Sequence, residues 1–450
     1  MRRIKVVFWA SLVSVAMLWM IADPVALQPA GFFPLRSAMV QISGLLAMTC
    51  MSLAMILALR PRWPERWLGG LDKMYRLHKW LGIGGLVLAI IHWLWSQGPK
   101  WAVSLGWLQR PRRGPPAEAG AFEQALTSWR PTAESVGELA FYAAVLLIAV
   151  ALIRRIPYRL FYKTHAFLAG LFLVLVFHTL ILLKFEYWAS PLGVLMAALL
   201  AYATWAAVLV LFRRVGAGRK VDGTIIKLNY RPELASLEGE IGSLQAWPGH
   251  RPGQFAFITT DEEEHAHPFT IASTWNPAEP QLTFIVKELG DYTRRLPQTL
   301  QIGQPVKIEG PYGCFTFNDD CPRQIWIGGG IGITPFIARM KQLAMDRRAY
   351  AGRPNLQVVD LFHTTANYSE EAIAKLRADA EAAGVRLHVL YDPREGLLTG
   401  NRIRAAVPDW KAASIWFCGP PSFGAALRSD FANQGLPVVN RFHQELFAMR

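Results

Sequence analysis

Two apolar stretches of this sequence have a histidine next to each end, and their pattern decides the fold. Residues 77–93 read LHKWLGIGGLVLAIIHW, and residues 164–179 read THAFLAGLFLVLVFHT. Each stretch suits a helix that crosses a membrane, which takes about 20 apolar residues. An ionisable side chain inside a membrane is costly and usually serves a function. The two stretches therefore predict membrane helices whose histidines have a task in the bilayer.

The spacing of these histidines predicts two levels in the membrane. His78 and His92 are 14 residues apart, and His165 and His178 are 13 residues apart, which is close to four helical turns, or about 20 Å. One predicted span separates the two helices, so they run parallel, and His78 is expected level with His165 and His92 level with His178. Two facing imidazoles can supply both axial ligands of a haem iron, so two stacked b-type haems are predicted. The spacing alone also fits another histidine-bound metal, and a lone membrane histidine can instead hydrogen-bond a neighbouring helix.

Six stretches of the sequence match a membrane span in length and composition. They are residues 5–22, 37–59, 74–95, 135–153, 160–183 and 190–212. The chain has a mean hydropathy of +0.21 and 18% charged residues, as expected for a membrane domain joined to a soluble one. The four cysteines show no CxxC pair and no zinc-finger spacing, so the sequence indicates neither a disulfide framework nor a zinc site.

The basic residues predict the orientation of the spans. They are dense before the first span and after the second, fourth and sixth, which is one side of the membrane, whereas the other side has few outside the 96–134 loop. The positive-inside rule then places the N-terminus and the soluble half in the cytoplasm, with the spans in the plasma (inner) membrane. This distribution accounts for the net charge of +14 without a nucleic-acid partner. The first span imitates a secretory signal but has no cleavage site of small residues, so an uncleaved helix is expected.

Beyond residue 219 the pattern becomes that of a soluble protein with two parts. Four short strands with Gly and Pro between them predict a small antiparallel barrel; they are 221–228, 254–258, 282–287 and 306–309. After residue 321 strands alternate with helices, which predicts a parallel nucleotide-binding sheet; its strands are expected at 324–327, 356–362, 385–391 and 414–417. The predicted fold is a six-helix transmembrane bundle (1–218), an antiparallel β-barrel (219–320) and a Rossmann-like α/β domain (321–450).

A glycine-rich turn follows the first strand of the α/β region. Residues 328–335 read GGGIGITP. The glycines allow a tight turn and close approach of a pyrophosphate, and the N-terminus of the following helix offers free N–H groups. Pro335 suits the first turn of that helix. Because a strand precedes the turn and a helix follows it, the context favours a dinucleotide site.

These features together resemble the NADPH oxidase / ferric reductase superfamily over nearly the whole chain. Besides the histidine pattern and the glycine-rich turn, the resemblance rests on HPFTIAS (267–273), which lies between two predicted strands, and on CGP (418–420). It implies a flavocytochrome b that uses two haems b, FAD and NADPH or NADH. The haem ligands that it implies are the four histidines of the two membrane levels.

The resemblance also implies roles for residues of the soluble half. Those implied to bind FAD are His267, Pro268, Phe269, Thr270, Ser273, Val286, Lys287, Gly290, Tyr292 and Thr293. Those implied to bind the nicotinamide nucleotide are Gly328, Gly329, Gly330, Gly332, Thr334, Pro335, Cys418, Gly419 and Pro420. Cys418 and Thr334 are expected beside the hydride-transfer contact, with a catalytic role. The ending FHQELF (442–447) resembles the family's terminus, whose last aromatic shields the flavin, so Phe447 is a further cofactor-binding and catalytic candidate.

The sequence leaves the electron acceptor open. Oxygen would give superoxide and make the protein an oxidase, whereas a ferric chelate, which the cationic 96–134 loop could attract, would make it an iron reductase. A third alternative is a haem-binding relay or redox sensor that serves a periplasmic protein partner. The second nucleotide strand shows no obvious Arg pair for a 2′-phosphate, so NADPH and NADH are both open. No EF-hand pattern is present.

Overall fold

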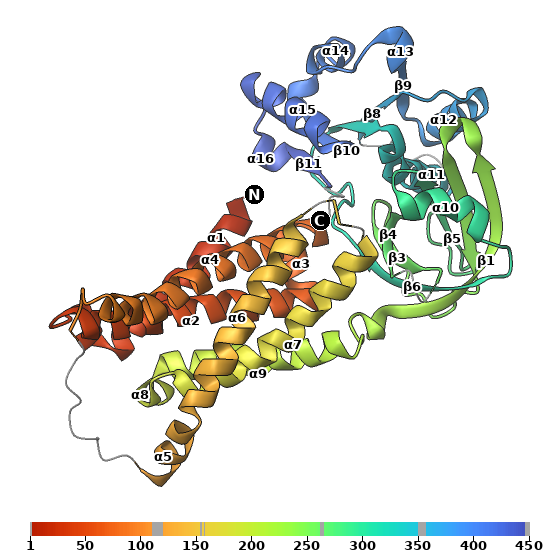
Figure 1. Cartoon of the computed structure of the whole chain (residues 1–450). Coiled ribbons are helices and arrows are strands. Elements are labelled where there is room, and N and C mark those ends of the chain that lie inside the picture. The colour runs from red at the N-terminus through yellow and green to blue at the C-terminus, as the bar shows by residue number, and fades with distance from the viewer. Residues whose placement is uncertain are drawn as a thin grey trace. The chain divides into compact units, whose positions relative to one another are not determined.

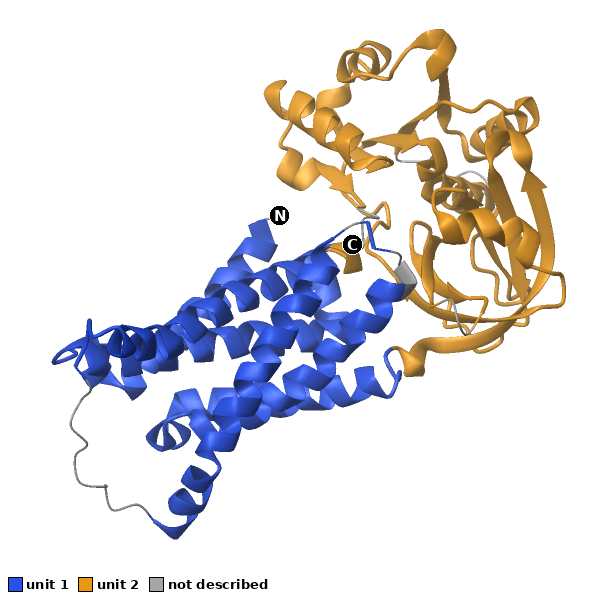
Figure 2. Ribbon diagram, in the orientation of Figure 1, with its two compact units in different colours: residues 1–68, 73–215, 450 blue, residues 69–72, 216–449 orange. Residues whose placement is uncertain are grey.

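The computed structural model describes residues 2–109, 120–153, 155–156, 158–261, 265–349 and 357–445. The chain divides into two units (Figure 2). Unit 1 holds nearly all residues up to Val215, and unit 2 holds the residues from Gly216 onward. The three domains predicted from the sequence, 1–218, 219–320 and 321–450, stay a prediction.

Six long helices form unit 1 (Figure 1). They are α1 (Arg2–Ala22), α2 (Phe32–Ala58), α4 (Leu71–Ser104), α6 (Arg130–Leu152), α7 (Tyr158–Leu182) and α9 (Pro191–Leu211). All six are long and apolar enough to cross a membrane, and each coincides with one predicted span. The shorter elements η1 (Pro24–Leu27), α3 (Arg62–Leu68), α5 (Ala121–Ser128) and α8 (Phe185–Trp188) lie between them. The predicted transmembrane bundle is therefore confirmed.

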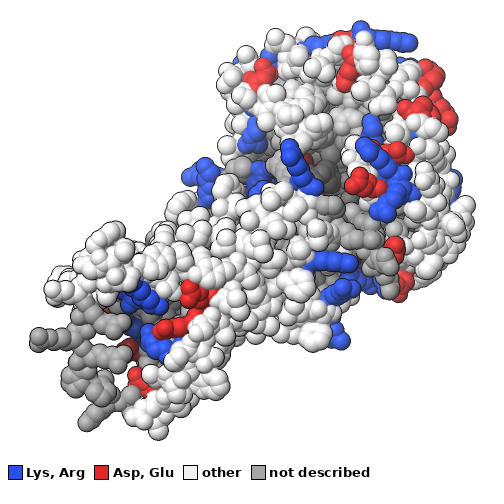
Figure 3. Space-filling view, viewed as in Figure 1, with Lys and Arg blue, Asp and Glu red and all other residues white. Residues whose placement is uncertain are grey.

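The bundle is apolar both inside and outside, as a bilayer requires. Leu45 of α2, Phe172 of α7 and Met196 of α9 are buried in one apolar cluster. Large apolar side chains such as Leu139 and Val194 are exposed on the outside of the bundle. On the face in Figure 3, the charged side chains that the structure describes in the helical unit lie toward its ends, and the surface between them is uncharged.

Unit 2 begins with a six-stranded antiparallel sheet of order β4-β3-β6-β1-β2-β5. The strands are β1 (Lys220–Arg231), β2 (Ser236–Gly242), β3 (Phe255–Thr259), β4 (His267–Thr270), β5 (Leu282–Lys287) and β6 (Pro305–Tyr312). The two edges meet, because Ile271 pairs with Phe284 and the N–H of Ala272 donates to the carbonyl of Thr283 at 2.8 Å. The sheet thus curls into the predicted barrel, and α10 (Asp291–Thr299) follows β5.

The strands β2 and β4 were not predicted. The first four residues of HPFTIAS, placed between strands by the sequence analysis, form β4 itself, with Phe255 of β3 opposite Thr270 and Ile258 opposite His267. A strand of four residues carries little local signal, because its hydrogen bonds are made with a partner strand and the preference for strand depends on that context.

The rest of unit 2 is a five-stranded parallel sheet of order β11-β10-β7-β8-β9. The strands are β7 (Arg323–Gly329), β8 (Val358–Thr365), β9 (Arg386–Tyr391), β10 (Ala413–Cys418) and β11 (Phe442–Gln444). Its helices include α11 (Thr334–Ala349), α12 (Glu370–Ala383), α14 (Gly400–Ala406) and α15 (Pro421–Asn433). Every strand predicted for this region is present within a few residues, which confirms the α/β nucleotide fold.

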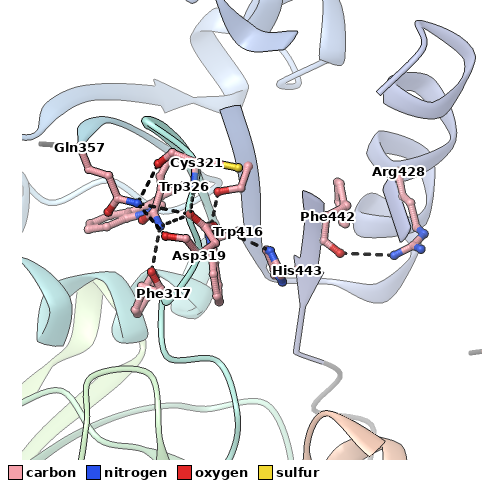
Figure 4. A network of polar contacts seen from close by, with 11 residues as sticks. Phe317, Asp319, Cys321, Trp326, Gln357, Trp416, Arg428, Phe442 and His443 are labelled. Atoms are coloured by element: carbon pink, nitrogen blue, oxygen red, sulfur yellow. Dashed lines mark hydrogen bonds and ion pairs between the residues drawn. The ribbon is translucent and has the colours of Figure 1, made fainter. Parts of the chain in front are cut away.

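β11 is a fifth strand that the sequence pattern did not predict, and a polar network on Asp319 accompanies it (Figure 4). Asp319 accepts hydrogen bonds from Trp416 Nε1 at 3.0 Å and from Gln324 Nε2 at 3.2 Å. Its carboxylate also lies 3.9 Å from His443 Nε2 of β11, and the His443 ring stacks on Trp416 with centroids 4.0 Å apart. The place of this last strand therefore depends on tertiary contacts rather than on a local pattern.

Candidate functional site

The four membrane histidines form two facing pairs between α4 and α7. The ring centroids of His78 and His165 are 5.9 Å apart, and those of His92 and His178 are 6.2 Å apart. A metal–imidazole bond is about 2.0–2.1 Å long and the ring centre lies about 1.1 Å beyond the nitrogen, so two imidazoles on opposite sides of one ion have centroids about 6.3 Å apart. Both pairs have the separation that two axial ligands of one iron require.

Backbone carbonyls fix the tautomer of three of these rings. The Nδ1 atom of His78 lies 2.9 Å from the carbonyl oxygen of Ala54, and the Nδ1 atom of His92 lies 2.9 Å from that of Val40. His178 makes the same contact with Ala133 at 2.8 Å. Because a carbonyl can only accept, each Nδ1 carries the proton and each Nε2 keeps its lone pair for a metal.

The fourth ring, that of His165, is placed differently. Among the described residues, none accepts a hydrogen bond from its buried Nδ1 atom. The ring instead stacks on Phe161, with centroids 5.1 Å apart and planes at 21°. We call a backbone carbonyl that accepts from the Nδ1–H of one of these rings a carbonyl anchor. The inner pair, His78 and His165, thus has one carbonyl anchor, whereas the outer pair, His92 and His178, has two.

The surroundings of the pairs fit haem better than another histidine-bound metal. Within the described part of the chain, no group of three or more His, Cys, Asp or Glu side chains is placed to hold a metal ion, whereas zinc takes three or four protein ligands. A Cβ added at Gly82 of α4 or Gly170 of α7 would meet no atom within 4 Å, so the space beside these backbones is open. Two facing imidazoles with open space beside their helices fit a six-coordinate haem.

The FAD candidates gather on β4 and the start of α10. The ring of His267 stacks on that of Tyr292, with centroids 3.9 Å apart, and Tyr292 shares a hydrogen bond of 2.8 Å with Thr260. Pro268 and Thr270 are half-buried on the same strand, and Phe269 packs against the apolar core of the barrel. Gly290 precedes α10 and its N–H donates to Thr293 Oγ1 at 3.0 Å; Val286 and Lys287 end β5.

Ser273 lies apart from this group and closes the barrel. Its Oγ accepts from the N–H of Thr283 at 3.1 Å, and its carbonyl accepts from His250 Nε2 at 2.9 Å. His250 is half-buried and desolvation lowers its pKa, so at neutral pH it is an uncharged donor to this carbonyl. The role of Ser273 at the flavin stays a prediction.

The glycine-rich turn packs against the segment after β10. A Cβ at Gly332 would lie 2.1 Å from the carbonyl oxygen of Cys418, and one at Gly329 would lie 3.0 Å from Pro420. Gly328 and Gly419 are similarly close to neighbouring backbone. Close packing of two chain segments is enough to explain glycine at these positions. Room for a bound phosphate would be an additional reason for glycine in the same turn.

Gly330 is the glycine of the turn that faces open space. Its φ is +55°, and a Cβ there would meet nothing within 4 Å. It starts η4 (Gly330–Ile333), and α11 follows with Thr334 and Pro335 in its first turn. Thr334 is buried and its Oγ1 donates to the carbonyl of Ile331 at 2.8 Å. The open backbone before a helix N-terminus fits an anionic ligand.

A cavity of about 140 Å³ lies beside this turn. Its lining includes Ile331, Lys287 and His363, together with Thr365 at the end of β8 and Asn367 just beyond it. Ligands of open α/β sheets bind outside the carboxyl ends of the strands, which is where these residues lie. Lys287 Nζ donates to Asn367 Oδ1 at 3.2 Å, so it links the barrel to the nucleotide sheet and brings a positive charge to the cavity.

Two residues near the nucleotide edge were missed by the sequence analysis. His363 is buried, its Nδ1 lies 3.1 Å from the carbonyl oxygen of Gly328, and burial lowers its pKa. Glu445 is buried as well, and together with burial it raises the pKa of Cys418 well above the ordinary value. A buried thiol of this kind stays protonated. No sequence pattern indicates the contacts of His363 or Glu445. Phe447, the predicted flavin-shielding aromatic, lies outside the described residues.

Comparison with known proteins finds matches to two parts of the chain. Residues 43–176 match the family described as ferric reductase like transmembrane component, and residues 244–316 match an FAD-binding domain family. The NADH-cytochrome b5 reductase 1 of Ajellomyces capsulatus is 30% identical over 33% of this chain and 52% of its own length. The NADPH oxidoreductase of Mycobacterium tuberculosis is 28% identical over 44% of this chain and 53% of its own.

Among solved structures, an Amycolatopsis cytochrome P450 reductase has a TM-score of 0.42 and 23% identity, over 51% of this chain and 70% of that one. The chain spans about half the length of the curated relatives it matches.

Proposed function

We propose that this chain, in which a ferric-reductase-like transmembrane component is joined to an FAD-binding domain, is a transmembrane NAD(P)H oxidoreductase. The soluble unit would hold FAD, which would supply the acceptance of a hydride from NAD(P)H, and the four membrane histidines would hold two haems b, which would supply one-electron transfer toward an acceptor on the outer side. The proposed acceptor is O2, which is reduced to superoxide. Both family matches agree with the resemblance to NADPH oxidases and ferric reductases that the sequence predicts.

The observation that carries the proposal is that the four membrane histidines face one another in two pairs. Their ring separations of 5.9 and 6.2 Å suit axial ligands of two haems. Three of the four imidazoles hydrogen-bond a carbonyl of a neighbouring helix, but such a bond needs no partner histidine opposite the ring, so the facing arrangement favours a shared metal. A bundle with two such levels serves transfer of electrons along its axis.

In the soluble unit, the chain's residues bind and orient the two dinucleotides. Gly330 leaves backbone N–H groups open to a pyrophosphate, and Lys287 supplies a positive charge beside it. Thr334 and Cys418 are buried beside the turn and hold the nicotinamide end against the flavin, which is the contact that hydride transfer needs. Neither residue has to exchange a proton for this task.

The proposed orientation places the N-terminus and the soluble unit in the cytoplasm. His78 and His165 then form the inner level and His92 and His178 the outer level. The basic segments that flank the spans support this direction, and so does the cytosolic supply of NAD(P)H.

A ferric chelate is the second candidate acceptor. The match of residues 43–176 to a ferric-reductase-like component favours it. In the proposed orientation, the basic residues of the 96–134 loop belong to the side from which such anionic chelates would arrive.

The first test uses the purified, FAD-supplied protein in air with NADPH. We expect a bis-imidazole haem spectrum and cytochrome c reduction that is largely abolished by superoxide dismutase. If the haems are reduced while the dismutase-sensitive rate is negligible, O2 is not the acceptor, and reduction of ferric citrate in the same preparation tests the second candidate. A preparation without a bis-imidazole haem spectrum would contradict the proposal as a whole.

A further inference from the structure

His178 lies in a notch of α6 that is open because Gly137 has no side chain. The Nδ1 atom of His178 donates to the carbonyl of Ala133 at 2.8 Å. In a helix this carbonyl also accepts from the N–H four residues later, which is that of Gly137. A Cβ at Gly137 would lie 2.0 Å from His178 Nδ1, far inside van der Waals contact. The imidazole and a side chain at position 137 therefore exclude one another.

The other outer histidine, His92 of α4, meets the same arrangement on the facing helix α2. The Nδ1 atom of His92 donates to the carbonyl of Val40 at 2.9 Å, and the residue four positions later is Gly44. A Cβ there would lie 3.1 Å from the His92 ring, which is tight but less severe than at Gly137. Ser43 Oγ is a further neighbour of His92 Nδ1 at 3.3 Å. Both outer rings thus meet a carbonyl followed by a glycine at i+4.

The inner level lacks this feature. His78 also donates to a helix carbonyl, that of Ala54 at 2.9 Å, but the residue four positions later is Ala58. For His165, no described residue accepts from Nδ1. The two levels therefore differ in how the rings are held, although the histidines that form them are spaced alike.

We propose that Gly137 and Gly44 are positioning residues of the outer histidine pair. They leave room for His178 and His92 to reach the Ala133 and Val40 carbonyls, which fixes each ring and keeps Nε2 as the nitrogen that binds iron. This inference rests on the proposed haem function and deepens it. A ring that donates its Nδ1–H to a carbonyl is a more basic ligand, and a more basic ligand stabilises ferric iron and lowers its reduction potential.

The consequence is a functional difference between the levels. Both outer rings carry the anchor, whereas only one inner ring does, so the ligands of the outer level favour the ferric state more strongly. An electron that reaches the outer level is then easier to pass on to an external acceptor. The glycines serve this by geometry alone, since the atoms nearest to an added Cβ at either position are those of the two histidine rings.

The test compares three Gly→Ala variants of the full-length, haem-loaded protein. Gly137→Ala is expected to weaken haem binding at the outer level by about 10–100-fold, as loss of an outer-shell partner does, or to shift one of the two haem potentials upward. Gly44→Ala, with its milder contact, should shift the same potential less. Gly84→Ala is the matched control, because its Cβ would meet the Phe8 ring at 2.9 Å and no histidine. The measurements are haem per chain, a redox titration and the low-spin EPR signals.

The outcomes separate this inference from the proposed function. If the unmodified protein binds no bis-imidazole haem, the proposed function fails, and this inference fails with it. If it binds two haems while Gly137→Ala and Gly44→Ala leave both potentials and EPR signals unchanged, only the role of the glycines is overturned. That role is also overturned if Gly84→Ala produces the same change. Where Gly137→Ala does not assemble, the result with Gly44→Ala decides.

Discussion

The histidine pairs of unit 1 and the nucleotide turn of unit 2 reach their geometry by different routes. In unit 1, helical periodicity and the length of a bilayer span place four histidines at two levels, and carbonyls of neighbouring helices then fix the rings. In unit 2, the turn after β7 takes its shape from the segment after β10, through contacts such as Gly332 against Cys418. The comparison shows that the positions of side chains in a helical site follow from their spacing in the sequence. The shape of a site at strand ends depends instead on which strands are neighbours in the sheet.

The largest effect is expected from removing one outer ligand. His92→Leu should reduce the haem content from two per chain to one and abolish electron transfer to an external acceptor, because the remaining imidazole cannot hold a six-coordinate iron. Reduction of FAD by NAD(P)H should continue at its normal rate, since it depends on unit 2 alone. Haem content by the pyridine haemochrome assay and anaerobic flavin reduction measure the two parts.

An equal loss of both activities in His92→Leu would break the comparison, because it would mean that unit 2 depends on the haem-bound bundle for its own geometry. His165→Leu serves as the partner experiment. It should remove the inner haem instead and leave flavin reduction intact as well.

The second largest effect concerns a buried charge in the nucleotide sheet. Asp360 of β8 has a side chain only 1% exposed and pairs with Arg323 at 3.0 Å and Arg386 at 2.8 Å. The Arg386 side chain is 55% exposed and Arg323 lies 3.6 Å from a second carboxylate, that of Asp409, so the arginines left without Asp360 stay solvated or paired. The cost is then that of a hydrogen bond to a charged group, about 1.5–3 kcal/mol. Asp360→Asn should therefore destabilise unit 2 by that amount, seen as an earlier release of FAD fluorescence on heating, with the haem spectrum unchanged.

The ion pair of Lys375 with Glu238 is the matched control for Asp360→Asn. It joins α12 to β2 at 3.2 Å, and the Lys375 side chain is 53% exposed. An exposed pair contributes about 0.2–1 kcal/mol, so Lys375→Ala should lower the same melting temperature only slightly. Comparable losses in the two variants would contradict the assignment of Asp360 as a buried structural charge.

The sequence predicted the elements and the spacing of the candidate site better than its contacts. The six spans and the two sheets are confirmed, because apolar length and strand alternation are local patterns. The carbonyl anchors on α2 and α6 were not predicted, since they depend on which helix faces come together. β4 and β11 were missed because short strands take their hydrogen bonds from neighbours. The contact of the Ser273 hydroxyl with Thr283 was not predicted either, and its expected place at the flavin stays a prediction.

A smaller effect is expected at the nucleotide turn. Thr334→Val keeps the shape of the side chain but removes the hydrogen bond from Oγ1 to the Ile331 carbonyl. Loss of one hydrogen bond costs about 1–1.5 kcal/mol, which corresponds to about tenfold in rate if it misplaces the nicotinamide. Stopped-flow flavin reduction by NAD(P)H measures the change. Thr334→Ser keeps the hydroxyl and should react nearly normally, and a slow serine variant beside a fast valine variant would refute the role.

The smallest effect is a pH dependence confined to unit 2. Burial lowers the pKa of His250 and of His363 in the folded protein, relative to about 6.5 in an unfolded chain. Below about pH 6.5 the unfolded state binds more protons than the folded state. The free energy of unfolding is therefore highest above that pH and decreases as the pH falls. Unit 2 should therefore be progressively easier to unfold in mild acid.

His250→Gln tests this sign at one residue. The amide can keep the hydrogen bond to the Ser273 carbonyl but cannot take up a proton, so the stability of unit 2 should fall less steeply with acid. The difference in slope is at most one proton, or about 1.4 kcal/mol per pH unit. Urea midpoints of FAD release from the full-length protein, measured between about pH 5 and pH 7.5, supply the slopes. A variant slope as steep as that of the unmodified protein would show that His250 does not titrate on unfolding, and the acid sensitivity of unit 2 would then have to come from His363 or the carboxylates.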